Sequence, residues 1–167
     1  TYNFPYVITN CSNNYGPYQF PEKLIPNTII KALTGNDISV YGDGSQIRDW
    51  LYVDDHIKAI MRVALEANDA ESYNIGGYNE IKNIDVVNAI CKILDSKVTN
   101  KPNSLASFKD LIRYVPDRPG HDTRYAINAE KITNDLNWMP DEDFESGIIQ
   151  GLPLSDTILS SMSLEVN

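Results

Sequence analysis

The chain has 167 residues, of which 42% are hydrophobic, and 14 basic and 23 acidic residues give it a formal net charge of −9 at pH 7. This length fits one domain, or part of a larger one, with a buried core. The acidic balance excludes broad binding to nucleic acids or anionic membranes, because both favour a basic surface. No apolar run is long enough to span a bilayer.

A strand, a loop and a helix are expected in the first part of the chain. We expect a buried strand at 6–9 and then a loop at 10–21 that is rich in asparagine, glycine and proline. Ligands of α/β proteins often bind where loops follow strands, which makes Asn13 and Asn14 candidate contacts. A helix is expected at 22–33, because apolar residues there recur at helical spacing.

The middle of the chain alternates short strands with a helix. Strands are expected at 38–41 and 50–53, with a glycine turn after the first of them. A helix at 56–66 follows, and we expect Asp54 or Asp55 to cap it, because acidic residues suit the positive end of a helix dipole.

The second half continues the same alternation. It predicts a strand at 72–77, a helix at 84–94 with Asn83 as its cap, a strand at 111–115 and a short helix at 129–136. Alternating strands and helices indicate an α/β architecture with at least part of a parallel sheet. Because the helices are short and the turns irregular, a small substrate lobe attached to a sheet fits better than a complete doubly wound domain.

Two arginines lie in segments that suit a diphosphate ligand. Arg48 lies in Gln-Ile-Arg-Asp-Trp-Leu-Tyr-Val at 46–53, and Arg118 lies in Asp-Arg-Pro-Gly-His-Asp at 117–122. A planar guanidinium presents several fixed donors to phosphate oxygens. An arginine beside an aspartate is most often a surface ion pair, so each segment alone is weak evidence. Together with the asparagine loop, they predict a phosphate-containing ligand.

Other motifs for cofactor binding, catalysis or metal binding are absent or lie in an unsuitable context. No Gly-x-Gly-x-x-Gly turn joins a strand to a helix, and the glycines at 42–44 are typical of a turn. Tyr78 and Lys82 have the spacing of the reductase tyrosine–lysine pair, but they lie in a loop after two glycines. No cysteine and histidine cluster has metal-ligand spacing. Cys11 and Cys91 lie in unlike contexts, which favours free thiols and a cytoplasmic protein.

Six segments together resemble the dTDP-glucose 4,6-dehydratases, a family of extended short-chain dehydrogenase/reductases that act on nucleotide sugars. They occur in the family's order over about residues 2–148, at 9–17, 21–26, 48–53, 73–77, 83–87 and 117–122. Arg-Asp-Trp-Leu and Asp-Arg-Pro-Gly-His-Asp are the most specific of them.

The resemblance implies a fold class and a division of the chain. It implies an α/β fold, the C-terminal part of an extended short-chain dehydrogenase/reductase, with the last strands of a Rossmann-type sheet and a small mixed α/β substrate-binding lobe. Residues 1–150 would bind the nucleotide sugar, with 1–16 and about 72–95 at the edge of the Rossmann sheet. Residues 151–167 depart from the family, and Pro153 would break a helix, so we expect a disordered tail there.

The resemblance also implies a reaction and a set of binding residues. In the family, NAD takes hydride from C4 of dTDP-glucose, water is lost across C5 and C6, and hydride returns to C6 of the 4-keto-6-deoxy product. By resemblance, Asn13 contacts the substrate and Asn14 contacts NAD. The nucleotide and diphosphate would be held by Lys23, Leu24, Ser39, Val40, Tyr41, Arg48, Asn83, Asp117, Arg118, Pro119, Gly120 and His121.

The family's glycine fingerprint, acidic dehydration residues and tyrosine–lysine pair all lie upstream of the matched segment. The chain also begins without methionine, so we expect part of a longer protein, with no catalytic residue of its own. The helices of the family homodimer are likewise expected to be absent, and a strand at 6–9 without its neighbour would expose an edge. Two alternatives stay open: the substrate lobe of a related UDP- or GDP-sugar epimerase or decarboxylase, and a binding module without catalysis.

Overall fold

Helices and strands alternate along the chain in the computed structural model, which describes residue 2 and residues 4–151. The elements are β1 (Ile8–Cys11), β2 (Asn13–Tyr15), α1 (Leu24–Leu33), β3 (Ile38–Tyr41), β4 (Ile47–Tyr52), α2 (Val53–Glu66), β5 (Ser72–Ile75), β6 (Glu80–Lys82), α3 (Asn83–Lys97), the 3-10 helices η1 (Pro102–Ser104) and η2 (Phe108–Leu111), β7 (Ile112–Val115), β8 (Arg124–Tyr125), α4 (Glu130–Leu136) and α5 (Phe144–Gly151). Four of the five strand pairs are parallel. The predicted α/β architecture is confirmed, and the predicted tail lies outside the described residues apart from Gly151.

The strand β4 joins the two halves of the fold. It pairs in parallel with β2 and β8 and antiparallel with β6. Successive side chains of a strand point to opposite faces, and on β4 this alternation sends Trp50 and Tyr52 into one hydrophobic cluster and Leu51 into another. The backbone of a single strand therefore lies between two cores.

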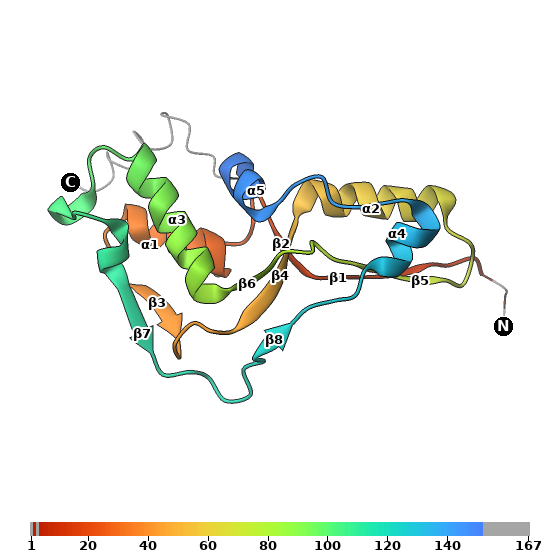
Figure 1. Ribbon diagram of the computed structural model, residues 1–167, viewed down its shortest axis with the longest axis horizontal. Helices are drawn as coiled ribbons and strands as arrows, with labels where there is room; N and C mark the ends of the chain where they lie inside the picture. Colours follow the sequence, from red (N-terminus) through yellow and green to blue (C-terminus); the bar gives the residue numbers. More distant parts are fainter. Residues whose placement is uncertain (1, 3, 152–167) are drawn as a thin grey trace.

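The larger core lies under α1, β3 and α3. The side chains of Val86, Ile90 and Leu94 on α3 are fully buried against α1, η2 and α5. In Figure 1, α1, α3, β3 and β7 form one end of the molecule. The helix α3 thus packs against α1 in this core.

The smaller core lies at the opposite end, between β5, α2 and α4 (Figure 1). The strand β1 pairs in parallel with β5, its only strand neighbour in the described part of the chain. Ile8 is 51% exposed, so the prediction of a buried first strand is wrong. The reason is that burial of a parallel strand needs a neighbour on each edge and cover on each face.

Within the described ranges no helix is long and apolar enough to cross a membrane.

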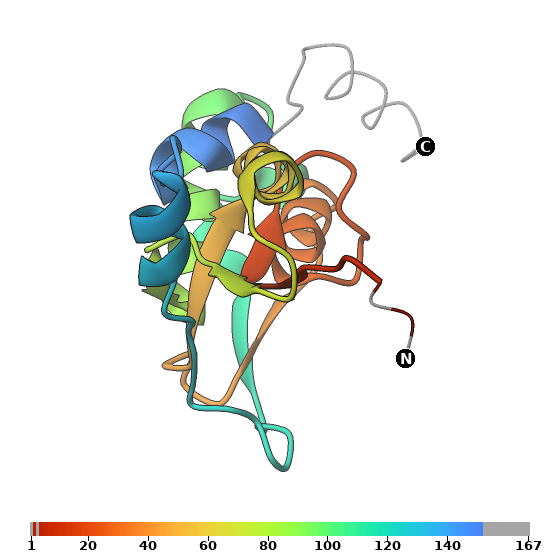
Figure 2. The same cartoon turned by 90° about the vertical axis from the view of Figure 1, so that its right-hand side faces the viewer.

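A buried carboxylate replaces the helix cap that the sequence suggests for α2. The prediction that Asp54 or Asp55 caps α2 is wrong, because the helix already begins at residue 53 and its cap makes no side-chain hydrogen bond. Asp55 is 1% exposed and instead accepts hydrogen bonds from the backbone amides of Asp141 (3.0 Å) and Glu142 (2.9 Å) and from Lys58 (3.0 Å). It therefore anchors the segment before α5 to α2. In the end-on view of Figure 2, α5 (blue) lies close to α2 (yellow).

The loop after β5 is held against β4 by Asp49 and Gly77. Asp49 is 2% exposed and accepts hydrogen bonds from the backbone amides of Gly77 (3.0 Å) and Asn79 (2.9 Å). The amide of Trp50 donates to the carbonyl of Asn79 (3.0 Å). A Cβ atom on Gly77 would lie 1.9 Å from the carbonyl oxygen of Trp50, so only glycine fits there.

Candidate functional site

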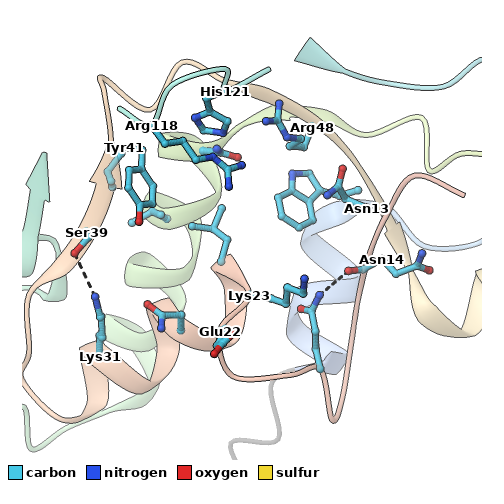
Figure 3. A pocket seen from close by; sticks show the side chains of 17 residues that line it. Asn13, Asn14, Glu22, Lys23, Lys31, Ser39, Tyr41, Arg48, Arg118 and His121 are labelled. Carbon is cyan, nitrogen blue, oxygen red and sulfur yellow. Dashed lines mark hydrogen bonds between the residues drawn. The ribbon is translucent and has the colours of Figure 1, made fainter. Parts of the chain in front are cut away.

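One pocket, with a volume of about 590 Å³, gathers side chains from α1, β2, β3, β4, α3 and the turn after β7. Figure 3 shows these side chains converging on a common space. Eleven of the fourteen residues that the sequence singles out line the pocket: Asn13, Asn14, Lys23, Leu24, Ser39, Val40, Tyr41, Arg48, Asn83, Arg118 and His121. The fold therefore brings together segments that are up to about a hundred residues apart in the chain.

Three of the four cationic side chains that line the pocket keep donors available for an anionic ligand. Lys23, Arg48 and Arg118 all line the pocket, and within the described ranges none of them forms an ion pair. Arg48 uses one guanidinium nitrogen, Nη1, to donate to the carbonyl of Ile47 (2.7 Å). Figure 3 shows Arg48 and Arg118 on one side of the pocket and Lys23 on the other, with Glu22 beside it. This arrangement suits a diphosphate, whose oxygens accept charge-assisted hydrogen bonds.

The turn that carries Arg118 is organised by Asp117. The Asp117 carboxylate accepts hydrogen bonds from the side chain of Gln46 (2.8 Å) and the backbone amide of Arg118 (2.8 Å), and it lies 2.7 Å from Nδ1 of His121. Asp117, Pro119 and Gly120 do not line the pocket. The structure thus gives Asp117 a supporting position, because its carboxylate is occupied by bonds within the turn.

We expect the order of this turn to depend on the charge of Asp117. The hydrogen bond from His121, followed by those from the Arg118 amide and Gln46, lowers the pKa of Asp117 below its ordinary value of 3.8. Its stabilising contribution is therefore complete above the ordinary carboxyl pKa and is lost as the pH falls through the lowered one. NMR signals of the His121 ring, recorded from about pH 6 down to about pH 3, measure this transition. The variant Asp117→Asn should not show it; the same transition in that variant would contradict the assignment.

Two asparagines at β2 present unsatisfied acceptors at the other end of the pocket. The side-chain nitrogen of Asn14, Nδ2, donates to the Cys11 sulfur (3.2 Å) and the Ser12 carbonyl (3.1 Å). The side-chain oxygens of Asn13 and Asn14 are buried and have no hydrogen-bond partner among the described residues. Because an unpaired buried acceptor costs free energy, these two oxygens suit a ligand that brings N–H or O–H donors.

Sequence reasoning missed six residues that line the pocket: Gln19, Glu22, Asn27, Lys31, Trp50 and Val87. The sequence does contain a signal for Asn27 and Lys31, because Lys23, Asn27 and Lys31 recur every four residues and so share one face of α1.

Asn83 lines the pocket as the first residue of α3 but does not cap that helix, so the predicted cap is wrong. In the described part of the chain no three His, Cys, Asp or Glu side chains gather as metal ligands would.

Comparison with known proteins relates this chain to nucleotide-sugar dehydratases. The family model described as GDP-mannose 4,6 dehydratase matches residues 1–150. The chain is 60% identical over 148 residues to a dTDP-glucose 4,6-dehydratase of Escherichia coli and 57% identical to that of Neisseria meningitidis serogroup B. These matches cover 89% of the chain but only 41% and 42% of the relatives. The chain thus spans about two fifths of the length of the curated relatives it matches.

Solved structures of the same enzymes have the same fold. The dTDP-glucose 4,6-dehydratase of Bacillus anthracis in complex with NAD is 47% identical, with a TM-score of 0.76, and the match covers 90% of this chain and 44% of that one. The Streptomyces venezuelae enzyme, solved with NAD and a dTDP ligand bound, is 37% identical, with a TM-score of 0.78 and the same coverage. The Rossmann-type fold class and the resemblance to dTDP-glucose 4,6-dehydratases are confirmed. Matched over most of its length by the family model, the chain belongs to the GDP-mannose 4,6-dehydratase family, and its relatives include the dTDP-glucose 4,6-dehydratases.

Proposed function

We propose that this chain forms the nucleotide-sugar-binding portion of a dTDP-glucose 4,6-dehydratase. The observation that carries the proposal is the group of three cations, Lys23, Arg48 and Arg118, that share one pocket without ion-pair partners in the described structure. Three such charges are held together in an otherwise acidic chain, and a diphosphate offsets their mutual repulsion. The high identity to curated dTDP-glucose 4,6-dehydratases supports the same assignment.

The proposal assigns a part of the substrate to each region of the pocket. The diphosphate lies between the three cations, and the sugar extends towards Asn13, whose buried oxygen accepts a hydrogen bond from a sugar hydroxyl. The buried acceptor of Asn14 suits the amide and hydroxyl donors of NAD. When bound, NAD supplies the hydride acceptor and donor of the reaction. The residues of this chain bind and orient the substrate.

The whole reaction would be the conversion of dTDP-glucose to dTDP-4-keto-6-deoxyglucose. We assign no residue in the described part of the chain the role of catalytic acid or base. The pocket is lined mainly by amides, cations and apolar side chains. We also propose a cytoplasmic location, since Cys11 and Cys91 are both free thiols.

Calorimetric titration of the 167-residue chain with dTDP, UDP and GDP tests the proposal. We expect saturable binding with a preference for dTDP. Because hydrogen bonds to charged groups contribute about 1.5–3 kcal/mol, Arg48→Ala and Arg118→Ala should each weaken binding about 10- to 100-fold. Arg62→Ala is the matched control, because Arg62 lies on α2, outside the pocket, and pairs with Glu66 (3.4 Å).

The outcomes separate the parts of the proposal. If a folded chain binds none of the three nucleotides, the nucleotide-binding role is overturned. If it prefers GDP or UDP, the pocket is a nucleotide site but the assignment to dTDP is overturned. Equal losses in Arg62→Ala and the two pocket variants would show that the effect does not come from direct contacts.

A further inference from the structure

A lysine at one end of the pocket has no role in the proposed binding of the diphosphate. The Lys31 ammonium donates to the hydroxyl of Ser39 (3.2 Å), and both side chains line the pocket. In the described ranges Lys31 has no carboxylate partner. Figure 3 shows Lys31 and Ser39 facing each other at the end of the pocket that is farthest from Asn13 and Asn14.

The helix α1 sets the distance between this lysine and the diphosphate region. Lys23, at the start of α1, and Lys31, in its last turn, lie on one face of the helix. Eight residues at 1.5 Å each separate them by about 12 Å along the axis. A nucleotide whose diphosphate lies near Lys23 therefore extends its base towards Lys31.

The strand β3 forms the opposite wall of this end. Its burial alternates: Ile38 and Val40 are buried, whereas Ser39 and Tyr41 are more exposed. Ser39, Val40 and Tyr41 all line the pocket. Tyr41 is 50% exposed and offers a ring against which a base can stack. Ser39 then orients the Lys31 ammonium towards the edge of a base that is stacked in this way.

We infer that Lys31 is a specificity-determining residue that donates a hydrogen bond to the O4 carbonyl of a pyrimidine base. The inference rests on the proposed function and deepens it. A lysine ammonium has three donors and no acceptor. It satisfies the O4 carbonyl of thymine or uracil, whereas the amino group of cytosine at the same position would meet it donor to donor. Sites that hydrogen-bond one substrate group strongly reject an analogue that lacks it.

Binding of dUDP and dCDP to the 167-residue chain tests this inference, because the two differ only at C4 and the adjacent ring nitrogen. We expect the wild-type chain to bind dUDP at least about tenfold more tightly than dCDP. In Lys31→Met this ratio should fall close to one. Ser39→Ala, which keeps the lysine but removes its partner, should give an intermediate ratio.

Lys97→Met is the matched control, because Lys97 is the basic residue in the last turn of α3 and lies outside the pocket. It should keep the wild-type ratio, which excludes a general effect of charge at a helix C-terminus. Wild-type binding without a dUDP preference, or a Lys31→Met chain that keeps it, would overturn the inference while leaving the proposed function intact. Failure of the folded wild-type chain to bind any nucleoside diphosphate would overturn the proposed function itself.

Discussion

Replacing Gly77 with alanine is expected to destabilise the fold by about 3 kcal/mol, because the new methyl group meets backbone that cannot move aside. The Cβ atom would lie 1.9 Å from the carbonyl oxygen of Trp50 and 2.6 Å from its carbonyl carbon. Relief of this clash requires the loop after β5 to separate from β4, which also breaks the hydrogen bond from the Gly77 amide to Asp49. Urea unfolding followed by tryptophan fluorescence measures the loss.

Gly120→Ala is the control for the clash at Gly77. In the described part of the chain no heavy atom lies within 4 Å of a Cβ placed on Gly120, although its φ is +70°. Its cost is therefore limited to the left-handed backbone conformation, about 1 kcal/mol. A loss for Gly77→Ala that is no larger than the loss for Gly120→Ala would show that the contact with β4 is not what requires a glycine.

Asp49→Ala is the second change with a large expected effect, again about 3 kcal/mol, because it leaves two backbone amides in the interior without an acceptor. These amides belong to Gly77 and Asn79, which donate to different oxygens of the carboxylate. The effect should extend to the pocket, since Asp49 lies between Arg48 and Trp50 on β4 and both neighbours line it. Nucleotide affinity should therefore fall although Asp49 itself is not a lining residue.

The control for Asp49→Ala is Asp43→Ala, which removes an exposed carboxylate that accepts one amide hydrogen bond, from Ser45 (2.9 Å). Solvent replaces that bond, so only a small change in unfolding free energy is expected. Asp49→Asn keeps one acceptor and should lie between the two. Equal stability of the Asp49→Ala and Asp43→Ala chains would contradict the buried role of Asp49.

The sequence predicts β1, β3, β4, β5, β7 and the helices α1 to α4 in their observed order, because apolar spacing and turn residues act locally. It does not predict the short strands β2, β6 and β8 or the helix α5. It also selects Arg48 and Arg118, because a guanidinium beside a stiff turn has recognisable chemistry before any contact is known. What it cannot predict are roles that depend on distant backbone. Asp55 reads as a helix cap, yet its partners are amides 86 and 87 positions away.

The same limit applies to burial and to the pocket lining. The first strand has the apolar composition of a buried strand, but its exposure depends on whether other strands and helices cover it. The sequence of one strand does not show which elements will cover it. Asp117 belongs to the motif that supplies Arg118, but its carboxylate is hydrogen-bonded to Gln46 and His121 and does not line the pocket. Lys31 carries no motif, and its place in the pocket follows only from the face of α1 that it shares with Lys23.

The position of β4 between two hydrophobic clusters has a consequence for cooperativity. The pocket lies against the larger cluster, and the smaller one, formed by residues such as Tyr73 and Ile132, meets it along β4 and through the bonds of Asp55 to the segment before α5. The two clusters can therefore open at different free energies, as separate units of local unfolding. A bound nucleotide would slow amide exchange around α1 and α3 by mass action and leave exchange in α2 and β5 almost unchanged. The molecule would then behave as two cooperative units, only one of which senses the ligand.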